Sequence, residues 1–509
     1  MNYLAIFLAL TPVVLLIILL GFLKVSGDKS AFYTLIVTIL LAALGFNFST
    51  TSIGLSIVFG TLKAIFPILL IIIMAIYSYN VLVYTKKMEV LKHQFSNIST
   101  DKTIQVLLLT WGFGGLLEGM AGFGTAVAIP AAILIGLGYK PLFSALVSLL
   151  SNSVPTAFGA VGIPVLMVSK EIGIETGDTA ALLNLGSEVV FQLMPLMVII
   201  PFLIVYLTDP SIKSLPKNIA LSLVVGVVSI VVQYYSVIYI GIETPAVLGS
   251  IASIFVIVLW AKFTAKKSDA ETDNSLSTGE IINAWSIYGL ILVFIIGTSP
   301  LLGGFRGFLQ SIASTPIHLT IEGAKKTINI FWLTDAGVLL FLGSVIGGLL
   351  QGAKFKELME VLWKSIIQLK KTYITVTSLI VLSTIMDLSG MIVVLGTAIA
   401  TTTGAFYPLF APAIGCLGAF LTGSDTSSNI LFGKLQAHVA QQIGGEPSWF
   451  AAANTVGATG GKIISPQSIA IATSACNQQG KEGEIMKKAL PYAIFYIIVA
   501  GLVVYFFGK

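Results

Sequence analysis

Long apolar stretches alternate with short polar ones along the chain. Predominantly apolar runs recur at residues 6–22, 35–48, 65–83, 195–207 and 494–507. About 20 such residues are needed to cross the hydrocarbon core of a bilayer. Because only helices and closed barrels satisfy their backbone groups in lipid, runs of this length predict membrane-spanning helices. We therefore expect an all-α polytopic protein that crosses the cell membrane many times.

The composition agrees with this pattern. Of the 509 residues 56% are hydrophobic and 10% are charged, whereas an ordinary soluble domain has roughly 25% charged residues. Lysines gather in a few polar stretches, which the positive-inside rule assigns to the cytoplasm: residues 86–102, 262–267, 354–371 and 481–488. The net charge of +5 is modest, and no basic patch of the kind that binds nucleic acid is present.

The most polar interior segment, KFTAKKSDAETDNSLSTGE at 262–280, predicts a solvated linker between two membrane halves, 1–261 and 281–509. The sequence MEVL occurs at 88–91 and again at 359–362, and the pair GM occurs at 119–120 and again at 390–391, both 271 residues apart. Each half is therefore expected to carry a related repeat with a glycine-broken hairpin. Positive-inside counting favours parallel repeats. Transporters with broken helices are more often built from inverted repeats, which we favour.

The segment GFGGLLEGMAGFGTAVAIP, residues 112–130, places six glycines around Glu118. Each glycine weakens a helix by up to about 1 kcal/mol relative to alanine, so a helix break is expected here. A carboxylate at membrane depth needs a partner, a water-filled cavity or a proton. A break also frees backbone N–H groups that can hold an anion, with Gly122 and Gly124 as candidates. The alternative is that the glycines allow close helix packing and Glu118 faces a polar loop.

Three further polar islands interrupt the apolar sequence. They are residues 149–164, with Ser151, Asn152, Ser153 and Thr156; residues 420–436, with Ser424, Asp425 and Thr426; and residues 454–472, with Lys462. Hydroxyl and amide groups at an unwound segment can replace the hydration shell of a carboxylate, and a lysine can pair with it. The alternatives are helix capping for the first island, a surface loop for the second and a lysine that reaches the membrane interface for the third.

Catalytic and cofactor motifs are missing from the sequence. The segment before Lys462 resembles a nucleotide-binding loop, but Val456 and Ile463 stand where that loop needs a glycine and a hydroxyl residue. No HExxH or GxSxG motif is present. Three scattered histidines and two cysteines predict neither a metal site nor a disulfide framework. We therefore expect neither an enzyme nor a bound cofactor or metal.

A family resemblance rests on four stretches taken together: LLEGMAGFGTAVAIPAAILIGLG, SNSVPTAFGAVGIP, LTGSDTSSNILFGKLQ and GGKIISPQSIAIA. In order and separation they resemble the signatures of the bacterial and archaeal L-lactate permease family. The resemblance implies a secondary transporter of about 12–14 transmembrane segments, with repeated halves that carry re-entrant hairpins. It also implies uptake of lactate, and often of glycolate or related 2-hydroxymonocarboxylates, with protons. One departure is Asp387, where the family tends to have asparagine.

Residues and resemblance together predict symport of a proton with L-lactate or a similar 2-hydroxymonocarboxylate such as glycolate. Lys462 and the hairpin N–H groups would hold the carboxylate, and the serine and threonine groups of the islands would contact it or the 2-hydroxyl. Glu118 and Asp425 are the candidates for the coupling proton, because burial raises the pKa of a carboxyl group. A sodium-coupled carboxylate transporter and a passive small-anion facilitator remain alternatives. A homodimer is expected by analogy alone.

Overall fold

The computed structural model of the protein describes residues 3–23, 25–96, 99–122, 124–175, 177–264, 277–321, 323–478 and 481–508. Before residue 265 the helices are α1 (Tyr3–Ile17), α2 (Gly27–Gly45), α3 (Thr50–Lys63), α4 (Leu70–Tyr84), α5 (Lys87–Ser96), α6 (Lys102–Leu107), α7 (Gly115–Met120), α8 (Thr125–Gly136), α9 (Pro141–Thr156), α10 (Gly159–Glu171), α11 (Thr179–Thr208), α12 (Leu215–Tyr239) and α13 (Pro245–Thr264). After residue 276 come α14 (Thr278–Gly297), α15 (Gly303–Ile312), β1 (Ser314–Ile321), β2 (Ala324–Phe331), α16 (Ala336–Leu350), α17 (Phe355–Gln368), α18 (Lys370–Leu388), α19 (Met391–Thr403), α20 (Tyr407–Thr422), α21 (Asp425–Ile443), α22 (Pro447–Lys462), α23 (Pro466–Ala475) and α24 (Glu482–Phe507). β1 and β2 form an antiparallel ribbon in which Ser314 pairs with Phe331.

The expected all-α polytopic architecture is confirmed. Ten helices in the described part of the chain are long and apolar enough to cross a membrane, and the number is eleven if the pair α9 and α10, bent by 51°, is counted as one broken span. This number is below the 12–14 segments that the family resemblance implies. Two of the ten spans, 50–84 and 391–422, are 35 and 32 residues long and each contains two helices in succession. Two further apolar helices, α8 and α16, are too short to be included.

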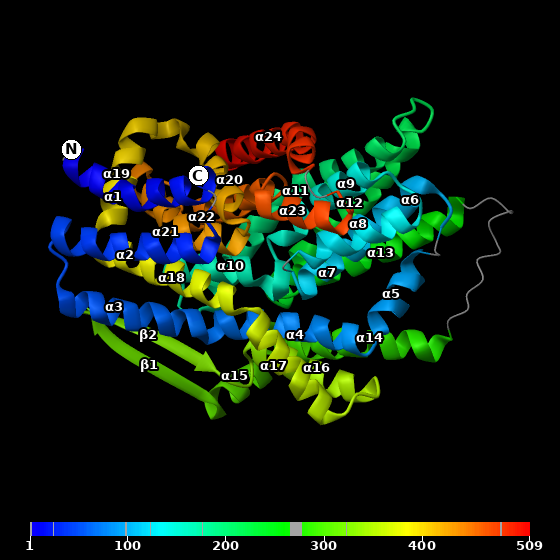
Figure 1. Ribbon diagram of the computed structural model, residues 1–509, viewed down its shortest axis with the longest axis horizontal. Coiled ribbons are helices and arrows are strands. Elements are labelled where there is room, and N and C mark those ends of the chain that lie inside the picture. The colour runs from blue at the N-terminus through cyan, green and yellow to red at the C-terminus, as the bar shows by residue number, and fades with distance from the viewer. Residues whose placement is uncertain are drawn as a thin grey trace.

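Two segments fold back on themselves as antiparallel helix pairs. In the first, α6 and α7 run against α8, and a Cβ atom built on Gly114 would lie 3.3 Å from the carbonyl oxygen of Ala126. In the second, α20 runs against α21, and the Ser428 hydroxyl donates to the carbonyl of Gly415 at 2.7 Å. The turns lie at residues 121–124 and 423–424. Figure 1 places α7 and α8 to the right of the centre and α20 and α21 to the left, so the two pairs approach the middle from opposite sides.

Two other helix pairs are separated by a short break. They are α9 with α10, and α22 with α23. Both α9 and α22 are 16 residues long and begin at a proline, Pro141 and Pro447, which lie 306 residues apart. Proline favours the first turn of a helix because its missing N–H group would have no partner there. This spacing differs from the 271 residues that separate the two copies of MEVL and the two copies of GM. The duplication of the chain and the inversion of its halves stay predictions.

The second GM pair, at residues 390–391, lies at the junction of two helices, and the hairpin predicted around it stays a prediction. Gly390 has a φ of +84° and joins α18 to α19. The turn that folds back in this half is instead the one between α20 and α21, about 33 residues further along the chain. Gly390 can serve as a simple helix junction because a glycine with positive φ ends one helix and begins another without steric cost.

The ends of the predicted linker are helical. Residues 262–264 complete α13, and Ser277 caps α14 in a capping box, accepting from the Glu280 N–H at 3.2 Å while the Glu280 carboxylate accepts from the Ser277 N–H at 2.9 Å. Residues 265–276 lie outside the described residues. The division of the chain into the halves 1–261 and 281–509 remains a prediction.

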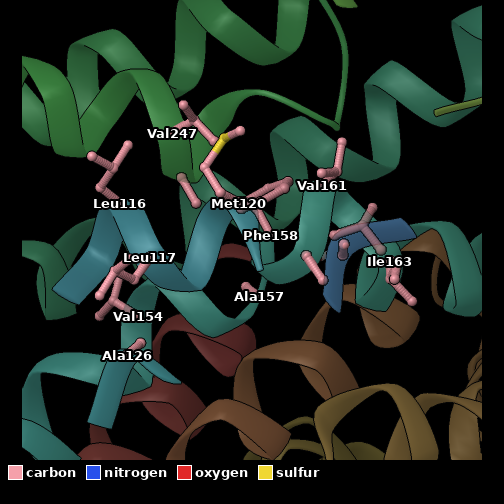
Figure 2. Packing of buried hydrophobic residues seen from close by; sticks show 14 of the residues in the cluster. Leu116, Leu117, Met120, Ala126, Val154, Ala157, Phe158, Val161, Ile163 and Val247 are labelled. Carbon is pink, nitrogen blue, oxygen red and sulfur yellow. The ribbon is translucent and has the colours of Figure 1, made fainter. Parts of the chain in front are cut away.

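The arm formed by α6 and α7 packs closely on α13. Gly112, Gly115 and Gly119 lie on the side that meets α13, and a Cβ atom built on Gly119 would lie 2.9 Å from Cγ2 of Val247. Figure 2 shows Val247 next to Met120, at the end of α7. Small residues allow two helices to approach this closely within a membrane. The packing fixes the position of the turn that follows α7.

Candidate functional site

Four interruptions of the helices meet at one cavity of about 390 Å³, called here the central cavity. They are the turn between α7 and α8, the break between α9 and α10, the turn between α20 and α21, and the break between α22 and α23. Helix ends leave backbone N–H and C=O groups that need other partners. The central cavity thus collects polar groups from distant parts of the chain, and Glu118 and Lys462, for example, are 344 residues apart.

A buried ion pair crosses the central cavity wall. The Lys462 ammonium donates to Glu118 Oε1 at 2.9 Å and to the Thr156 hydroxyl at 3.2 Å. The Asn152 amide donates to the same hydroxyl at 3.2 Å, and this hydroxyl lies 3.3 Å from Glu118 Oε1. The side chains of Glu118 and Lys462 are only 3% and 13% exposed. Because removing one partner of such a pair leaves a buried charge, which costs about 3–5 kcal/mol, each charge depends on the other.

Several carboxylate oxygens at the site have no donor. Among the described residues, Glu118 Oε2 and both side-chain oxygens of Asp425 are buried without a hydrogen-bond partner. Asp425 is 2% exposed and interacts electrostatically with both Lys462 and Glu118. An ionised carboxylate buried in this way is strongly unfavourable unless it gains a proton or a ligand. The same part of the chain contains no group of three or more His, Cys, Asp or Glu side chains placed to hold a metal ion.

The turn after α7 depends on glycine. Gly122 and Gly124 have φ angles of +62° and +87°, a region that side chains disfavour. A Cβ atom on Gly124 would also lie 2.6 Å from Cδ1 of Ile471 on α23. Both interpretations of the glycine-rich segment therefore apply, because its last two glycines form a break and earlier ones provide close packing.

The break between α9 and α10 contains an unusual backbone conformation. Ala160, Val161 and Gly162 have φ angles of +43°, +62° and +79° in succession. A β-branched residue is rarely found there, and such strain persists where the surrounding structure enforces it, often at functional sites. Gly159, just before this run, packs against the carboxylate of Glu118, since a Cβ atom at this position would lie 2.8 Å from Oε1. The break thus brings the start of α10 directly against the buried acid.

The turn between α20 and α21 places hydroxyl groups at the central cavity. Gly423 has a φ of +71° and ends α20, and the Ser424 hydroxyl caps α21 by accepting from the Ser427 N–H at 3.2 Å. Thr426 is half-buried, lines the central cavity, and its hydroxyl makes no hydrogen bond to any described residue. Gln467 of α23 packs against Gly423 from the opposite side. These groups can contact a polar ligand in the cavity.

Most of the predicted site residues come together in the structure. Those that line the central cavity are Glu118, Gly122, Gly124, Ser424, Asp425, Thr426 and Lys462. Ser151, Asn152 and Ser153 do not line it. The two serine hydroxyls donate to carbonyl groups of their own helix at 3.1 and 2.7 Å, while Asn152 holds Thr156. Of the four polar residues named in this island, only Thr156, at the last turn of α9, therefore lines the cavity, and the three predicted to bind the substrate do not.

The sequence analysis did not single out the mouth of the central cavity. Asp28 near the start of α2 lies there with Lys371 and Thr375 of α18, and Asp28 and Lys371 interact electrostatically. Lys371 belongs to a group of lysines for which the sequence predicts only a position on the cytoplasmic side of the membrane. Gln467 and Ser468 also line the cavity and lie within the polar island of residues 454–472, in which only Lys462 was named as a candidate.

Known proteins resemble this chain over nearly its full length. A sequence model of the L-lactate permease family matches residues 5–508. The L-lactate permease of Streptococcus iniae is 38% identical, with 87% of this chain and 93% of the relative covered. The glycolate permease GlcA of Escherichia coli K12 is 31% identical, with 97% of this chain and 94% of the relative covered.

Among solved structures, the chain is similar to MtrF of Neisseria gonorrhoeae, described with a class of antimetabolite efflux pumps. The TM-score is 0.49, the identity is 13% and 95% of each chain is covered. The family assignment rests on the sequence matches, and the helices described above agree with an integral membrane protein. The chain belongs to the L-lactate permease family and is a multi-pass membrane permease, not an enzyme.

Proposed function

We propose that this permease takes up L-lactate or glycolate together with a proton. The names of the relatives support this class of substrate, since both an L-lactate permease and a glycolate permease align with nearly the whole chain. Both substrates are small 2-hydroxymonocarboxylates with one negative charge. The observation that carries the proposal is the ion pair between Glu118 and Lys462, which lies in the wall of the central cavity beside open polar groups.

The ion pair couples the proton to the anion. While Glu118 is ionised it occupies Lys462, so a substrate carboxylate has no free cation. A proton on Glu118 neutralises it and leaves Lys462 with an uncompensated charge, which a substrate carboxylate can then pair with. Proton and anion together add no net charge to a buried site, whereas either alone leaves a charge unpaired. The two are therefore carried in the same step.

Other groups of the central cavity complete the binding of the substrate. The turns at Gly122 and Gly124 present backbone groups to the carboxylate, as helix ends do in other transporters. The hydroxyls of Ser424 and Thr426 lie at the same cavity and suit the 2-hydroxyl group. Asp425, whose two oxygens have no donor, is the second candidate for a transported proton.

In this conformation the central cavity faces the cytoplasm. Its mouth lies at the first turns of α18, where Lys370 and Lys371 follow the lysine-rich helix α17. Short lysine-rich connections of membrane proteins lie on the cytoplasmic side. Uptake then requires a second state in which the site faces outward, reached when the unit that carries the two turns moves against the remaining helices.

The test is uptake of labelled L-lactate into proteoliposomes, with a pH gradient in one set and a sodium gradient in another. We expect accumulation with the pH gradient alone. Glu118→Gln should abolish accumulation but retain lactate exchange, because a neutral side chain still leaves Lys462 to the substrate. Lys462→Ala should abolish both.

Accumulation that needs sodium would refute proton coupling. Equilibration without accumulation under either gradient would show a passive facilitator. Proton-driven accumulation that persists in Glu118→Gln would show that another group carries the coupling proton. Asp425→Asn would then test the second candidate.

A further inference from the structure

A second cavity, of about 230 Å³, lies beside β2 and between α3, α10, α18 and α21. Five lysines and three acidic residues line it, which gives it an excess of positive charge. Its charged side chains include Lys63, Lys170, Glu171, Asp387 and Lys434. Figure 1 shows the β1–β2 ribbon running below α3, at the edge of the molecule.

Most of the buried charge in the second cavity is already paired. Lys63 donates to Glu171 at 2.7 Å, and Lys434 pairs with Asp387. Lys170 differs, because no carboxylate of the described residues lies within ion-pair distance of it. Its side chain is partly buried and also borders a smaller adjoining cavity of about 90 Å³. The second cavity therefore holds a partly buried lysine that interacts electrostatically with Asp335 and Glu171 but forms no direct ion pair with a carboxylate of the described residues.

The second cavity lies on the far side of the molecule from the mouth of the central cavity. Lys371, at the mouth, and Asp387, at the second cavity, are 16 residues apart on α18, about 24 Å along a helix. On α10, Ile163 lines the central cavity and Lys170 lies seven residues later, about 10 Å further along the helix. The residues between them on α10 are largely buried and close the path in this conformation.

We propose that the second cavity is an external anion site that binds a small monocarboxylate through Lys170 before the anion passes along α10 to the central cavity. This inference rests on the proposed function, because the transported anion is the ligand. A carboxylate gains a charge-assisted hydrogen bond from an ammonium group that is not already bonded directly to another carboxylate. Thr327 and Thr384 line the same space, and although the Thr384 hydroxyl donates to the Ile380 carbonyl and the Thr327 hydroxyl bonds to His318, both oxygens can accept a hydrogen bond from the 2-hydroxyl. The excess positive charge raises the local concentration of anions there.

The experiment measures initial rates of L-lactate uptake by intact cells that have no other lactate carrier, and efflux from the same cells after loading. For Lys170→Gln we expect the half-saturating external concentration to rise about tenfold, the loss expected for one hydrogen bond to a charged group. The maximum uptake rate and the efflux rate should change little, because the central cavity is intact. Lys170→Arg, which keeps the cation, should restore external affinity.

Lys213→Gln is the matched control, since it removes a lysine from the exposed loop between α11 and α12. It should leave uptake unchanged. Unchanged external affinity in Lys170→Gln would overturn the external site, as would an equal loss of rate in both directions, which would make Lys170 structural. A wild-type protein that moves no lactate in either direction would instead refute the proposed function.

Discussion

The carboxylate of Glu118 has one oxygen paired with Lys462 and one without a donor. A group that binds and releases a proton during transport requires this arrangement. A carboxylate with hydrogen-bond donors on both oxygens would remain ionised. The Thr156 hydroxyl accepts from Lys462, lies 3.3 Å from Glu118 Oε1, and makes its shorter bond by donating to the Asn152 carbonyl at 2.5 Å. In the proposed mechanism this hydroxyl keeps Glu118 and Lys462 in place while Glu118 gains the proton and Lys462 pairs with the substrate carboxylate.

Charged residues of the site could be predicted from the sequence, and the hydroxyl residues only in part. Glu118 and Lys462 stand out because ionisable groups within long apolar stretches are rare and costly. Ser151, Ser153 and Thr156 look alike in the sequence, but only Thr156 reaches the central cavity, because it lies at the last helical residue before the break. The pairing of Glu118 with Lys462 could not be foreseen, since neither segment encodes where the other helix ends.

A single added methyl group tests the packing of α7. Gly119→Ala places a Cβ atom 2.9 Å from Val247 and 3.0 Å from its backbone nitrogen, so we expect a loss of about 1–3 kcal/mol in stability from overpacking. The measurement is thermal unfolding of the purified protein in detergent. Gly136→Ala, on α8, has open space around the same atom and should be neutral or slightly stabilising. Equal effects of the two substitutions would argue against close packing of α7 on α13.

Comparison of α9 with α20 shows why helix direction is hard to predict. Each is 16 residues long, has a proline in its first turn and ends at a threonine, Thr156 or Thr422. After α9 the chain bends by 51° and continues, whereas after α20 it folds back. After α20, Gly423 and the capping residue Ser424 lead directly into α21. After α9, the left-handed residues 160–162 come before the regular part of α10. The polar islands therefore predicted where the helices break but not where the chain goes next.

A buried amide of α21 connects this helix to α20 and α22. Gln436 donates to the Ala411 carbonyl at 2.8 Å and to Asn454 Oδ1 at 3.1 Å, and it accepts from the Tyr407 hydroxyl. Gln436→Leu leaves these partners unsatisfied, at about 1–3 kcal/mol for each buried group. We expect a clearly lower unfolding temperature in detergent. Gln442→Leu, on the exposed side of the same helix, should have little effect, and a similar loss there would contradict this role for Gln436.

Two ion pairs connect the helices of the central cavity to the rest of the molecule. α10 and α21 both begin at that cavity. At the last residue of α10, Glu171 pairs with Lys63 of α3, and midway along α21, Lys434 pairs with Asp387 of α18. The Ser383 hydroxyl of α18 also donates to the second oxygen of Glu171 at 2.7 Å. If α10 and α21 move against α3 and α18 during transport, these contacts must break. They therefore stabilise the conformation in which the mouth of the central cavity is open.

Glu171→Gln should shift the protein away from this conformation. The Lys63–Glu171 pair is 14% and 3% exposed, and loss of one partner of a buried pair costs about 3–5 kcal/mol, enough to change the populations of two states more than tenfold. The readout is the rate at which a membrane-impermeant thiol reagent, added from the cytoplasmic side, labels Thr375→Cys at the mouth. The two native cysteines are first replaced.

Labelling should be slower in Glu171→Gln because the mouth is closed for more of the time. The charge-swapped double variant Lys63→Glu/Glu171→Lys should recover the original rate, since it restores a pair at the same place. Glu89→Gln removes an acid from the exposed pair with Lys92 on α5, where ion pairs contribute little, and serves as the control. Equal labelling rates in all four proteins would mean that the pair does not distinguish the two states. A slow rate in both Glu171→Gln and the double variant would instead assign the effect to loss of local structure, because only a role in charge pairing can be rescued by exchanging the two charges.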